Sequence, residues 1–411
     1  MENPIMILVY VLLIGMYLFE LWLSVLNYKH RNAPIPESVK DVYNQKEYKK
    51  HQKYTMENFK FGLIEKGINR LILIIFLATG FFIFIDKVAS DISNNIYLQV
   101  LVFLLIYFII TFVIDIFFSY YHTFKIEEKY GFNRTSKKTF ITDKIKSLLL
   151  SIILGGGLVY GLLVLHRETS WLFFVYAWLA LSVIMVIINL IYTKVFVPMF
   201  NKLTPLEEGD LRTKIEEFAE SVGYEIDKIS VMDASKRSTK LNAFFSGFGK
   251  TKRIVLFDTL VEKMDDEEIV AVLAHEIGHS KHKHIIFNLL QTIIIFSVYV
   301  LLLGLLLEAK IFSTAFGFED INLGFNLILY VIIISPILMI INIFTSFLSR
   351  KFEYQADKFV SDNYKKDKFI SALKKLAKAN YTNLTPHPLY VKLFYSHPPI
   401  ANRIEAIEEQ K

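Results

Sequence analysis

The stretch Ala274-His275-Glu276-Ile277-Gly278-His279 places two histidines four residues apart inside a helical pattern. Residues four apart share one face of an α-helix, so both imidazoles can reach a single metal ion while Glu276 lies beside them. A catalytic zinc lowers the pKa of its bound water to about 7, and a neighbouring carboxylate can then remove a proton from that water. The stretch thus predicts half of a zinc site with Glu276 as its base. A buried helix whose histidines only pack or hydrogen-bond is the alternative interpretation.

The residues before this stretch predict how its helix begins and what precedes it. Asp265 and Glu268 have the spacing of a capping box at the helix start. Further upstream, three short apolar runs are typical of strands, at residues 228–232, 242–246 and 253–257. The last two runs are joined through Gly247 and Gly249. A small sheet therefore leads into the zinc helix, and the edge of such a sheet can pair with an extended substrate backbone.

The composition indicates a protein that crosses a membrane several times. Of the 411 residues, 53% are hydrophobic and 36 are phenylalanine, which is too apolar for an ordinary soluble protein. The chain has no cysteine, so a metal must be bound by histidine and carboxylate side chains. Seven stretches are long and apolar enough to span a bilayer: residues 4–26, 68–85, 96–118, 148–165, 171–193, 285–307 and 325–348. The fourth contains three glycines and could instead be a buried or re-entrant helix.

Basic residues in the connections predict the orientation of these spans. From the N-terminus to the C-terminus, the connections contain 9, 1, 7, 1, 14, 1 and 12 lysines and arginines. Basic connections lie on the cytosolic side of a membrane. The alternation favours seven crossings, with the N-terminus outside and the C-terminus in the cytosol. The net charge of +6 reflects the same bias, so we expect the lipid bilayer as a partner and no nucleic acid.

A second pair of residues four apart supplies the rest of the predicted metal site. Glu353 and Asp357 follow the last span and share a helix face at the cytosolic end, where the histidine motif also lies. Glu353 can complete the ligand set, and Asp357 can orient a ligand histidine through its other ring nitrogen. His282 and His284 also follow the motif, but a site built with His282 on one straight helix must bridge about 10.5 Å between Cα atoms. A distant carboxylate is the easier third ligand. A solvated helix end is the alternative for the second pair.

The C-terminal stretch Ser396-His397-Pro398 and the nearby Arg403 offer two further polar groups. A histidine and an arginine near zinc would suit stabilisation of the oxyanion in a tetrahedral transition state. In the other interpretation, the prolines open a helix and Arg403 pairs with a nearby glutamate.

Together these motifs resemble the type I CAAX prenyl proteases, which are integral-membrane zinc metalloproteases with seven helices around a large internal chamber. The similarity covers nearly the whole chain and rests on residues 123–140, 240–245, 275–279, 353–357 and 396–398. The resemblance implies one Zn²⁺ per chain, bound by His275, His279 and Glu353, with Glu276 as general base. It also implies roles for the remaining candidates. Asp357 would contact a zinc ligand without binding the zinc itself, Asn242 and Ala243 would belong to the substrate-binding edge, and His397 and Arg403 would stabilise the oxyanion.

Three features favour the cytoplasmic membrane of a bacterium over the endoplasmic reticulum. Ser280 stands where eukaryotic members often have tryptophan. Residues 408–411 carry no dilysine-type retrieval signal. The chain is also rich in isoleucine, lysine, asparagine and phenylalanine.

We therefore predict a mainly α-helical, polytopic membrane protein with a small cytosolic α+β zinc-protease domain. Residues 1–198 hold five spans, 199–284 the protease segment, 285–348 two more spans, and 349–411 a cytosolic C-terminal segment. The expected function is a zinc endopeptidase that cleaves near the C-terminus of a peptide or protein substrate of the prenylated CAAX type. The alternatives are a membrane-protein quality-control protease of broad specificity and a non-catalytic helix bundle with structural zinc.

Overall fold

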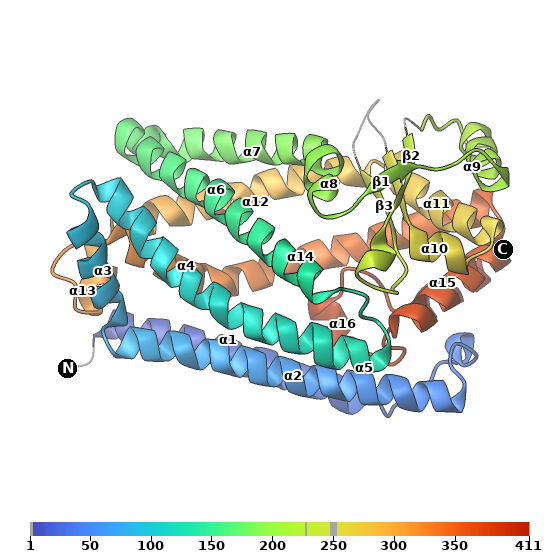
Figure 1. Ribbon diagram of the computed structural model, residues 1–411, viewed down its shortest axis with the longest axis horizontal. Helices are drawn as coiled ribbons and strands as arrows, with labels where there is room; N and C mark the ends of the chain where they lie inside the picture. The colour runs from blue at the N-terminus through green and yellow to red at the C-terminus, as the bar shows by residue number, and fades with distance from the viewer. Residues whose placement is uncertain (1–2, 227, 247–252, 411) are drawn as a thin grey trace.

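Long helices that lie side by side make up most of this computed structural model (Figure 1). The structure describes residues 3–226, 228–246 and 253–410, so the predicted connection through Gly247 and Gly249 lies outside it. The helices are α1 (Pro4–His30), α2 (Gln45–Ala78), α3 (Phe81–Ile92), α4 (Ile96–Tyr121), α5 (Glu128–Tyr130), α6 (Lys137–Thr169), α7 (Phe173–Ile191), α8 (Val197–Phe200), α9 (Asp210–Ser221), α10 (Asp258–Lys263), α11 (Asp266–Lys281), α12 (His284–Leu307), α13 (Lys310–Ala315), α14 (Leu323–Asn363), α15 (Lys366–Asn380), α16 (Pro388–Phe394) and α17 (Ile400–Glu409). The strands are β1 (Leu203–Pro205), β2 (Lys228–Met232), β3 (Ala243–Ser246) and β4 (Arg253–Phe257).

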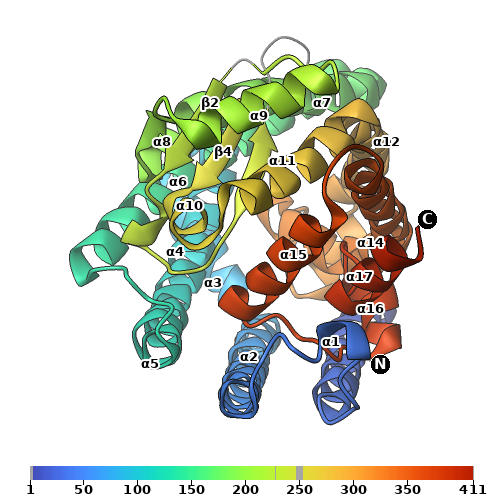
Figure 2. The ribbon, with the colours of Figure 1, turned by 90° about the vertical axis from the view of Figure 1, so that its right-hand side faces the viewer.

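The long helices follow one another around a closed ring. α1 contacts both α2 and α14, α4 contacts α3 and α6, and α7 contacts α6 and α12. The ring closes where α12 contacts α14, and α2 contacts α3. Figure 2 looks along this bundle from the end that holds the C-terminus. The sheet and the helix α11, which carries the histidine motif, therefore stand at one end of a helical ring (Figure 2).

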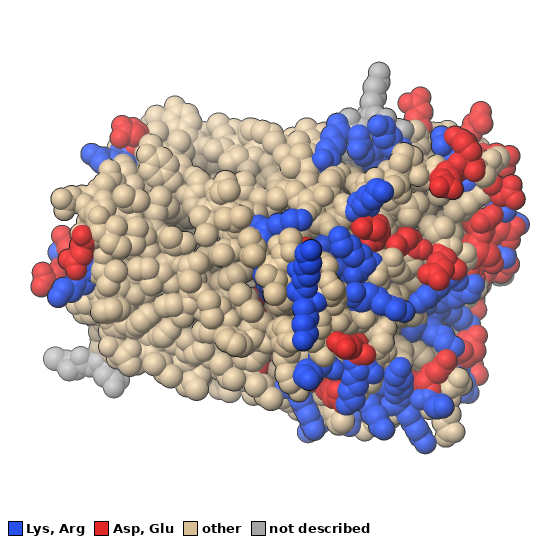
Figure 3. Space-filling view, viewed as in Figure 1, with Lys and Arg blue, Asp and Glu red and all other residues tan. Residues whose placement is uncertain are grey.

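The surface of the bundle has the character expected of membrane spans. Five helical segments of the described chain are long and apolar enough to cross a membrane, or six if the bent pair of α2 and α3 is one span. One of the five, Lys137–Phe200, contains both α6 and α7. Figure 3 shows a broad belt with few charges, and the charged residues gather at the end that holds the C-terminus. The prediction of an integral, multi-pass membrane protein is confirmed at this level.

The predicted second span, residues 68–85, is wrong as a single helix. α2 ends at Ala78, and α3 leaves it at an angle of 70°. Gly80 adopts φ +71°, a left-handed conformation that glycine reaches without a steric penalty. The apolar run continues across this turn, so hydropathy alone could not reveal it. The glycine-containing fourth stretch, by contrast, lies inside the continuous helix α6.

An apolar core closes the end of the bundle opposite the C-terminus. Phe82 of α3, Phe103 of α4 and Phe325 of α14 are each at most 2% exposed. The ring centroids of Phe82 and Phe325 lie 5.4 Å apart, and those of Phe82 and Phe103 lie 6.0 Å apart. A Cβ at Gly324 would lie 2.6 Å from the Phe103 ring, so the small residue lets α14 approach α4 closely.

The protease segment contains the predicted strands and one that was missed. The sheet order is β1-β2-β4-β3, with β2 parallel to β4 and the other pairs antiparallel. β4 is one of the two inner strands of the sheet. Its sequence is a continuous apolar run because Ile254, Val255 and Leu256 are all buried. β1 was not predicted because it is three residues long and ends in Pro205. β1 and β3 are the two edge strands of this sheet, and β3 is the one that α11 contacts.

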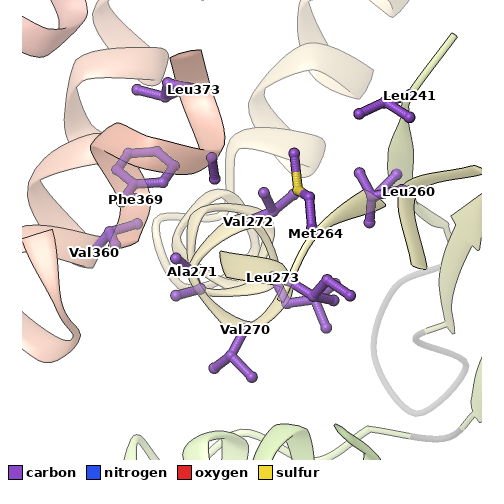
Figure 4. Packing of buried hydrophobic residues seen from close by; sticks show 14 of the residues in the cluster. Leu241, Leu260, Met264, Val270, Ala271, Val272, Leu273, Val360, Phe369 and Leu373 are labelled. Atoms are coloured by element: carbon purple, nitrogen blue, oxygen red, sulfur yellow. The ribbon is translucent and has the colours of Figure 1, made fainter. Parts of the chain in front are cut away.

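α11 is buried between the sheet and the C-terminal helices, as the view along its axis shows (Figure 4). Val270, Leu273 and Ala274 are each at most 1% exposed. They belong to one core with Leu260 and with Phe369 of α15. Burial of each large apolar side chain stabilises the fold by about 1.5–3 kcal/mol. The helix that carries the histidine motif is therefore rigidly held.

Candidate metal centre

The start of α11 is fixed by the predicted capping box. The Asp265 side chain accepts a hydrogen bond from the Glu268 amide at 2.9 Å, and the Glu268 carboxylate accepts one from the Asp265 amide at 3.0 Å. Glu268 is only 2% exposed and also pairs with Lys375 of α15 at 2.6 Å. The cap therefore links the start of the motif helix to the C-terminal segment.

α11 and α14 approach each other closely at Gly278. A Cβ at this position would lie 3.1 Å from Phe359 Cβ and 3.2 Å from Ala356 Cα. Because Ala356 lies between Glu353 and Asp357 on α14, this approach brings the two predicted half-sites together. The glycine inside the motif thus leaves the room that this close packing of the two helices uses.

His275, His279 and Glu353 form one cluster of potential ligand atoms within 4.8 Å of one another. His279 Nε2 lies 3.1 Å from His275 Nε2 and 3.2 Å from Glu353 Oε1. His275 Nε2 lies 3.5 Å from Glu353 Oε2. Two imidazoles and one glutamate are a ligand set typical of catalytic zinc, which keeps its fourth position for water.

The Glu353 carboxylate fits the presence of a cation. Its Oε2 atom is buried and accepts no hydrogen bond from the described residues. A buried carboxylate oxygen without a partner is costly. A metal ion bound by this oxygen and the two imidazoles would remove that cost, so the residues present fit the predicted zinc.

Asp357 and Arg403 lie directly behind His275. Asp357 Oδ1 is 2.9 Å from His275 Nδ1, which leaves Nε2 of this histidine for the metal. The Arg403 guanidinium donates to both carboxylate oxygens of Asp357, at 2.6 and 2.9 Å. Asp357 is fully buried, and Arg403 is 7% exposed. Arg403 Nη1 also lies 3.4 Å from Glu353 Oε2.

His397 comes to the same cluster from the loop before α17. Its Nε2 atom lies 3.3 Å from Glu353 Oε1, and its side chain is 64% exposed. The Ser396 hydroxyl lies 2.9 Å from its Nδ1. His397 can therefore reach a molecule bound at the metal, whereas the Arg403 side chain is enclosed.

Glu276 differs from its neighbours because no described residue hydrogen-bonds to its carboxylate. Burial raises the pKa of the Glu276 carboxyl. A carboxyl whose pKa moves towards neutrality is better matched to proton transfer at neutral pH. At His275, burial opposes protonation, but the nearby carboxylates of Asp357 and Glu353 raise the pKa to about 9.

One residue at this centre was not recognised in its observed position. The sequence analysis noted only that His284 follows the motif. In the structure its Nδ1 lies 2.9 Å from Nδ1 of His279, on the side of the ring away from Glu353. Its short distance in sequence from the motif was the available signal. The turn that directs it could not be read from the residue pattern.

The predicted substrate edge lies beside the motif helix. Ala243 begins the edge strand β3, Asn242 precedes it with an exposed side chain, and α11 contacts this strand. The Asn380 side chain donates to Leu241 O at 3.0 Å and accepts from Leu241 N at 2.9 Å. Asn380 therefore fixes the backbone just before the strand.

The segment 123–140, to which the residues alone assigned no chemistry, holds the protease segment in place. The helix here widens to a π-helix over His122–Glu127. Glu127 Oε2 lies 2.8 Å from Lys240 Nζ, and its other carboxylate oxygen accepts from the Tyr54 hydroxyl at 2.5 Å. The Arg134 amide donates to Arg237 O at 3.0 Å. This segment thus positions the chain that leads into β3.

Two family models together match nearly the whole chain. Residues 24–202 match the model described as the CAAX prenyl protease N-terminal domain, with five membrane helices. Residues 205–411 match the model of peptidase family M48. The boundary between the two matches falls at β1, where the last helices of the bundle lead into the sheet.

Similar proteins match over almost their full length. The CAAX prenyl protease 1 homolog of Oryza sativa subsp. japonica is 32% identical over 418 residues, which is 100% of this chain and 98% of the relative. CAAX prenyl protease 1 of Saccharomyces cerevisiae is 33% identical over 426 residues, covering 96% of this chain and 93% of that protein. The crystal structure of S. mikatae Ste24p superposes with a TM-score of 0.93 at 31% identity, covering 99% of this chain and 100% of that one.

Proposed function

This chain belongs to peptidase family M48 with a CAAX prenyl protease N-terminal domain, and we propose that it hydrolyses a peptide bond near the C-terminus of prenylated CAAX-type substrates. One observation supports this proposal more strongly than the others. The cluster of His275, His279 and Glu353 stands beside Glu276, in a chain that matches proteins named CAAX prenyl protease 1 over nearly their whole length.

The residues of the cluster have different roles in the reaction. One Zn²⁺ per chain, bound by His275, His279 and Glu353, would polarise the scissile carbonyl and acidify a water molecule. Glu276 takes the proton from that water and later delivers it to the leaving amine. Its carboxylate makes no hydrogen bond with the described residues, and its raised pKa suits both transfers.

His397 and Arg403 act on the oxyanion in different ways. His397 is exposed and lies 3.3 Å from Glu353, so it can donate directly to the carbonyl oxygen of a bound peptide. The guanidinium of Arg403 is occupied by Asp357. Arg403 therefore contributes its positive charge from behind the ligands, and Asp357 orients His275.

The substrate backbone adds to the free edge of β3. An extended peptide can extend a sheet by pairing with an edge strand. Asn242 and Ala243 stand at the start of this edge, next to α11. This arrangement would hold the scissile bond in a fixed register relative to the metal.

We infer seven crossings, with the N-terminus outside and the protease site in the cytosol. α6 and α7 count as separate spans within the segment Lys137–Phe200, and the bent pair of α2 and α3 counts as one. The ring of helices and the apolar core at its outer end support a chamber that opens towards the protease end. The composition and Ser280 favour the cytoplasmic membrane of a bacterium.

The test is cleavage of a farnesylated CAAX peptide by the purified protein, with zinc content measured in every sample. We expect Glu276→Gln to keep one zinc and to lose activity by about 10²- to 10⁴-fold, the usual contribution of a general base. Glu267→Gln is the matched control, because Glu267 lies on the same helix but pairs with the exposed Lys365 and the half-buried Lys368.

Each other result contradicts a defined part of the proposal. A wild-type protein that holds zinc and cleaves unmodified peptides equally well is a protease of broad specificity. If Glu276→Gln and the wild type cleave at the same rate, Glu276 is not the base. A protein that holds zinc and cleaves no peptide uses the metal structurally.

A further inference from the structure

His284 is a buried histidine that contacts a metal ligand from behind. It is 2% exposed, although it is the first residue of α12. Its Nδ1 lies 2.9 Å from Nδ1 of His279, and its Nε2 lies 2.9 Å from Oε1 of Gln355 on α14. The ring is therefore in contact with polar atoms at both of its nitrogens.

The chemistry of the two imidazoles fixes the direction of these hydrogen bonds. If His279 binds the metal through Nε2, its Nδ1 carries the proton and must donate it. His284 then accepts at Nδ1, so it is neutral and carries its own proton on Nε2. That proton is donated to the Gln355 amide oxygen. A single chain of donors thus runs from His279 through His284 to Gln355.

The backbone and the aromatic neighbours hold His284 in this position. Lys283, between α11 and α12, has a positive φ of 59°, which is unusual for a residue other than glycine. This turn directs His284 back towards α11. Its ring stacks on Phe352 at a centroid distance of 4.2 Å and an interplanar angle of 13°. Strained backbone conformations such as this persist only where the surrounding structure enforces them.

We propose that His284 is a positioning residue for the metal ligand His279, linking it to Gln355 as Asp357 links His275 to Arg403. Each ligand histidine then has its own partner on the ring nitrogen that faces away from the metal. The two partners differ in charge, because Asp357 is a carboxylate and His284 is a neutral acceptor. The inference rests on the metal site of the proposed function and deepens it.

The chain of contacts also ties the metal site to the membrane helices. His284 begins α12, Gln355 lies on α14 two residues after Glu353, and α12 contacts α14. A small displacement of α12 relative to α14 would therefore change the orientation of His279. The proposal predicts that the ligand geometry depends on this junction as well as on α11.

The test measures zinc affinity of the full-length protein by competition with a chelator, without substrate. Loss of an outer partner of a metal-ligating histidine typically weakens metal binding about 10- to 100-fold, and we expect this for His284→Ala. His284→Asn keeps an acceptor near the position of Nδ1 and should restore most of the affinity. His282→Ala is the matched control, because its ring stacks on His284 at 5.5 Å without a hydrogen bond to His279.

The outcomes separate this inference from the proposed substrate. Equal zinc affinity in His284→Ala and the wild type, or equal weakening in His284→Ala and His284→Asn, overturns it. If His284→Ala does not fold, Gln355→Leu is the variant to measure. Wild-type zinc affinity in Gln355→Leu would overturn the proposed chain of hydrogen bonds from His279 through His284 to Gln355. A protein that shows the expected affinities but cleaves no farnesylated peptide supports the role of His284 and contradicts the substrate.

Discussion

Asp357 Oδ1 lies 2.9 Å from His275 Nδ1, and the same carboxylate is bound by the guanidinium of Arg403. This carboxylate is fully buried, and its two partners are each only 7% exposed. It orients a metal ligand and neutralises a buried arginine. The integrity of the centre therefore depends on a residue that we do not expect to touch the metal.

Asp357→Asn should weaken both metal binding and the fold. We expect zinc affinity to fall about 10- to 100-fold because the ligand loses its oriented, charged partner. We also expect a loss of about 3–5 kcal/mol of stability, because the buried Arg403 loses its counter-ion. Chelator competition and denaturant unfolding measure the two effects.

Asp362→Asn is the control for this substitution. Asp362 lies on the same helix and forms an exposed pair with Lys358 at 3.1 Å, a type of contact that contributes about 0–1 kcal/mol. Equal behaviour of Asp357→Asn and Asp362→Asn would contradict the assigned role of Asp357.

Removal of the metal should lower the thermal stability of the end of the molecule that holds the metal site. Without the metal, the buried Glu353 Oε2 atom has no hydrogen-bond partner among the described residues, and the repulsion between the carboxylates of Glu353 and Glu276 is no longer offset by a bound cation. A ligand present at 100 times its Kd stabilises the folded state by about 2.7 kcal/mol. We expect a chelator to lower Tm by several degrees and added Zn²⁺ to restore it. Glu353→Gln should show no such response, and an identical response in this variant would contradict the ligand set.

Much of the architecture could be predicted because its signals are local. The capping box of Asp265 and Glu268 and the apolar run of β4 each depend on neighbouring residues, and the structure contains both. The left-handed turn at Gly80 was missed because an apolar run continues through it. Hydropathy records the length of such a run and carries no information about a change of backbone direction.

At the candidate site, too, the local features could be predicted and the contacts between distant residues could not. The spacing of four predicted that each half-site occupies one helix face. The predicted topology paired the two halves, because it places both at the same end of the spans. The contact between His279 and His284 could not be predicted, because it depends on a positive φ at Lys283 that no glycine marks. The two partners of Asp357 likewise lie 82 and 46 residues away in sequence, so only the tertiary structure brings them together.

Gly278→Ala should separate the two helices that carry the ligands. The new Cβ would lie 3.1 Å from Phe359 Cβ and 3.3 Å from the Ala356 carbonyl oxygen, so α11 or α14 must move. Overpacking of this kind typically costs about 1–3 kcal/mol. We expect this loss in denaturant unfolding, together with weaker zinc binding.

Gly62→Ala on α2 is the control for this effect, because nothing lies within 4 Å of the added Cβ. It should leave both zinc affinity and stability at or above wild type. Wild-type stability and zinc binding in Gly278→Ala would show that the two helices are not in close contact at the motif.

Lys240→Met should weaken substrate binding while leaving the metal in place. Lys240 lies two residues before Asn242 and pairs with the half-buried Glu127 at 2.8 Å, so its loss frees the chain that leads into the edge strand β3. We expect a several-fold increase in KM for a peptide substrate, unchanged zinc content, and a stability loss of about 1 kcal/mol because the lysine is partly exposed. Lys263→Met is the control, since Lys263 is exposed and only approaches the Thr239 carbonyl oxygen at 3.4 Å. If Lys240→Met instead shows a lower zinc content and an unchanged KM, this ion pair affects the metal site. That result would contradict the role of the segment 123–140 in positioning the substrate edge.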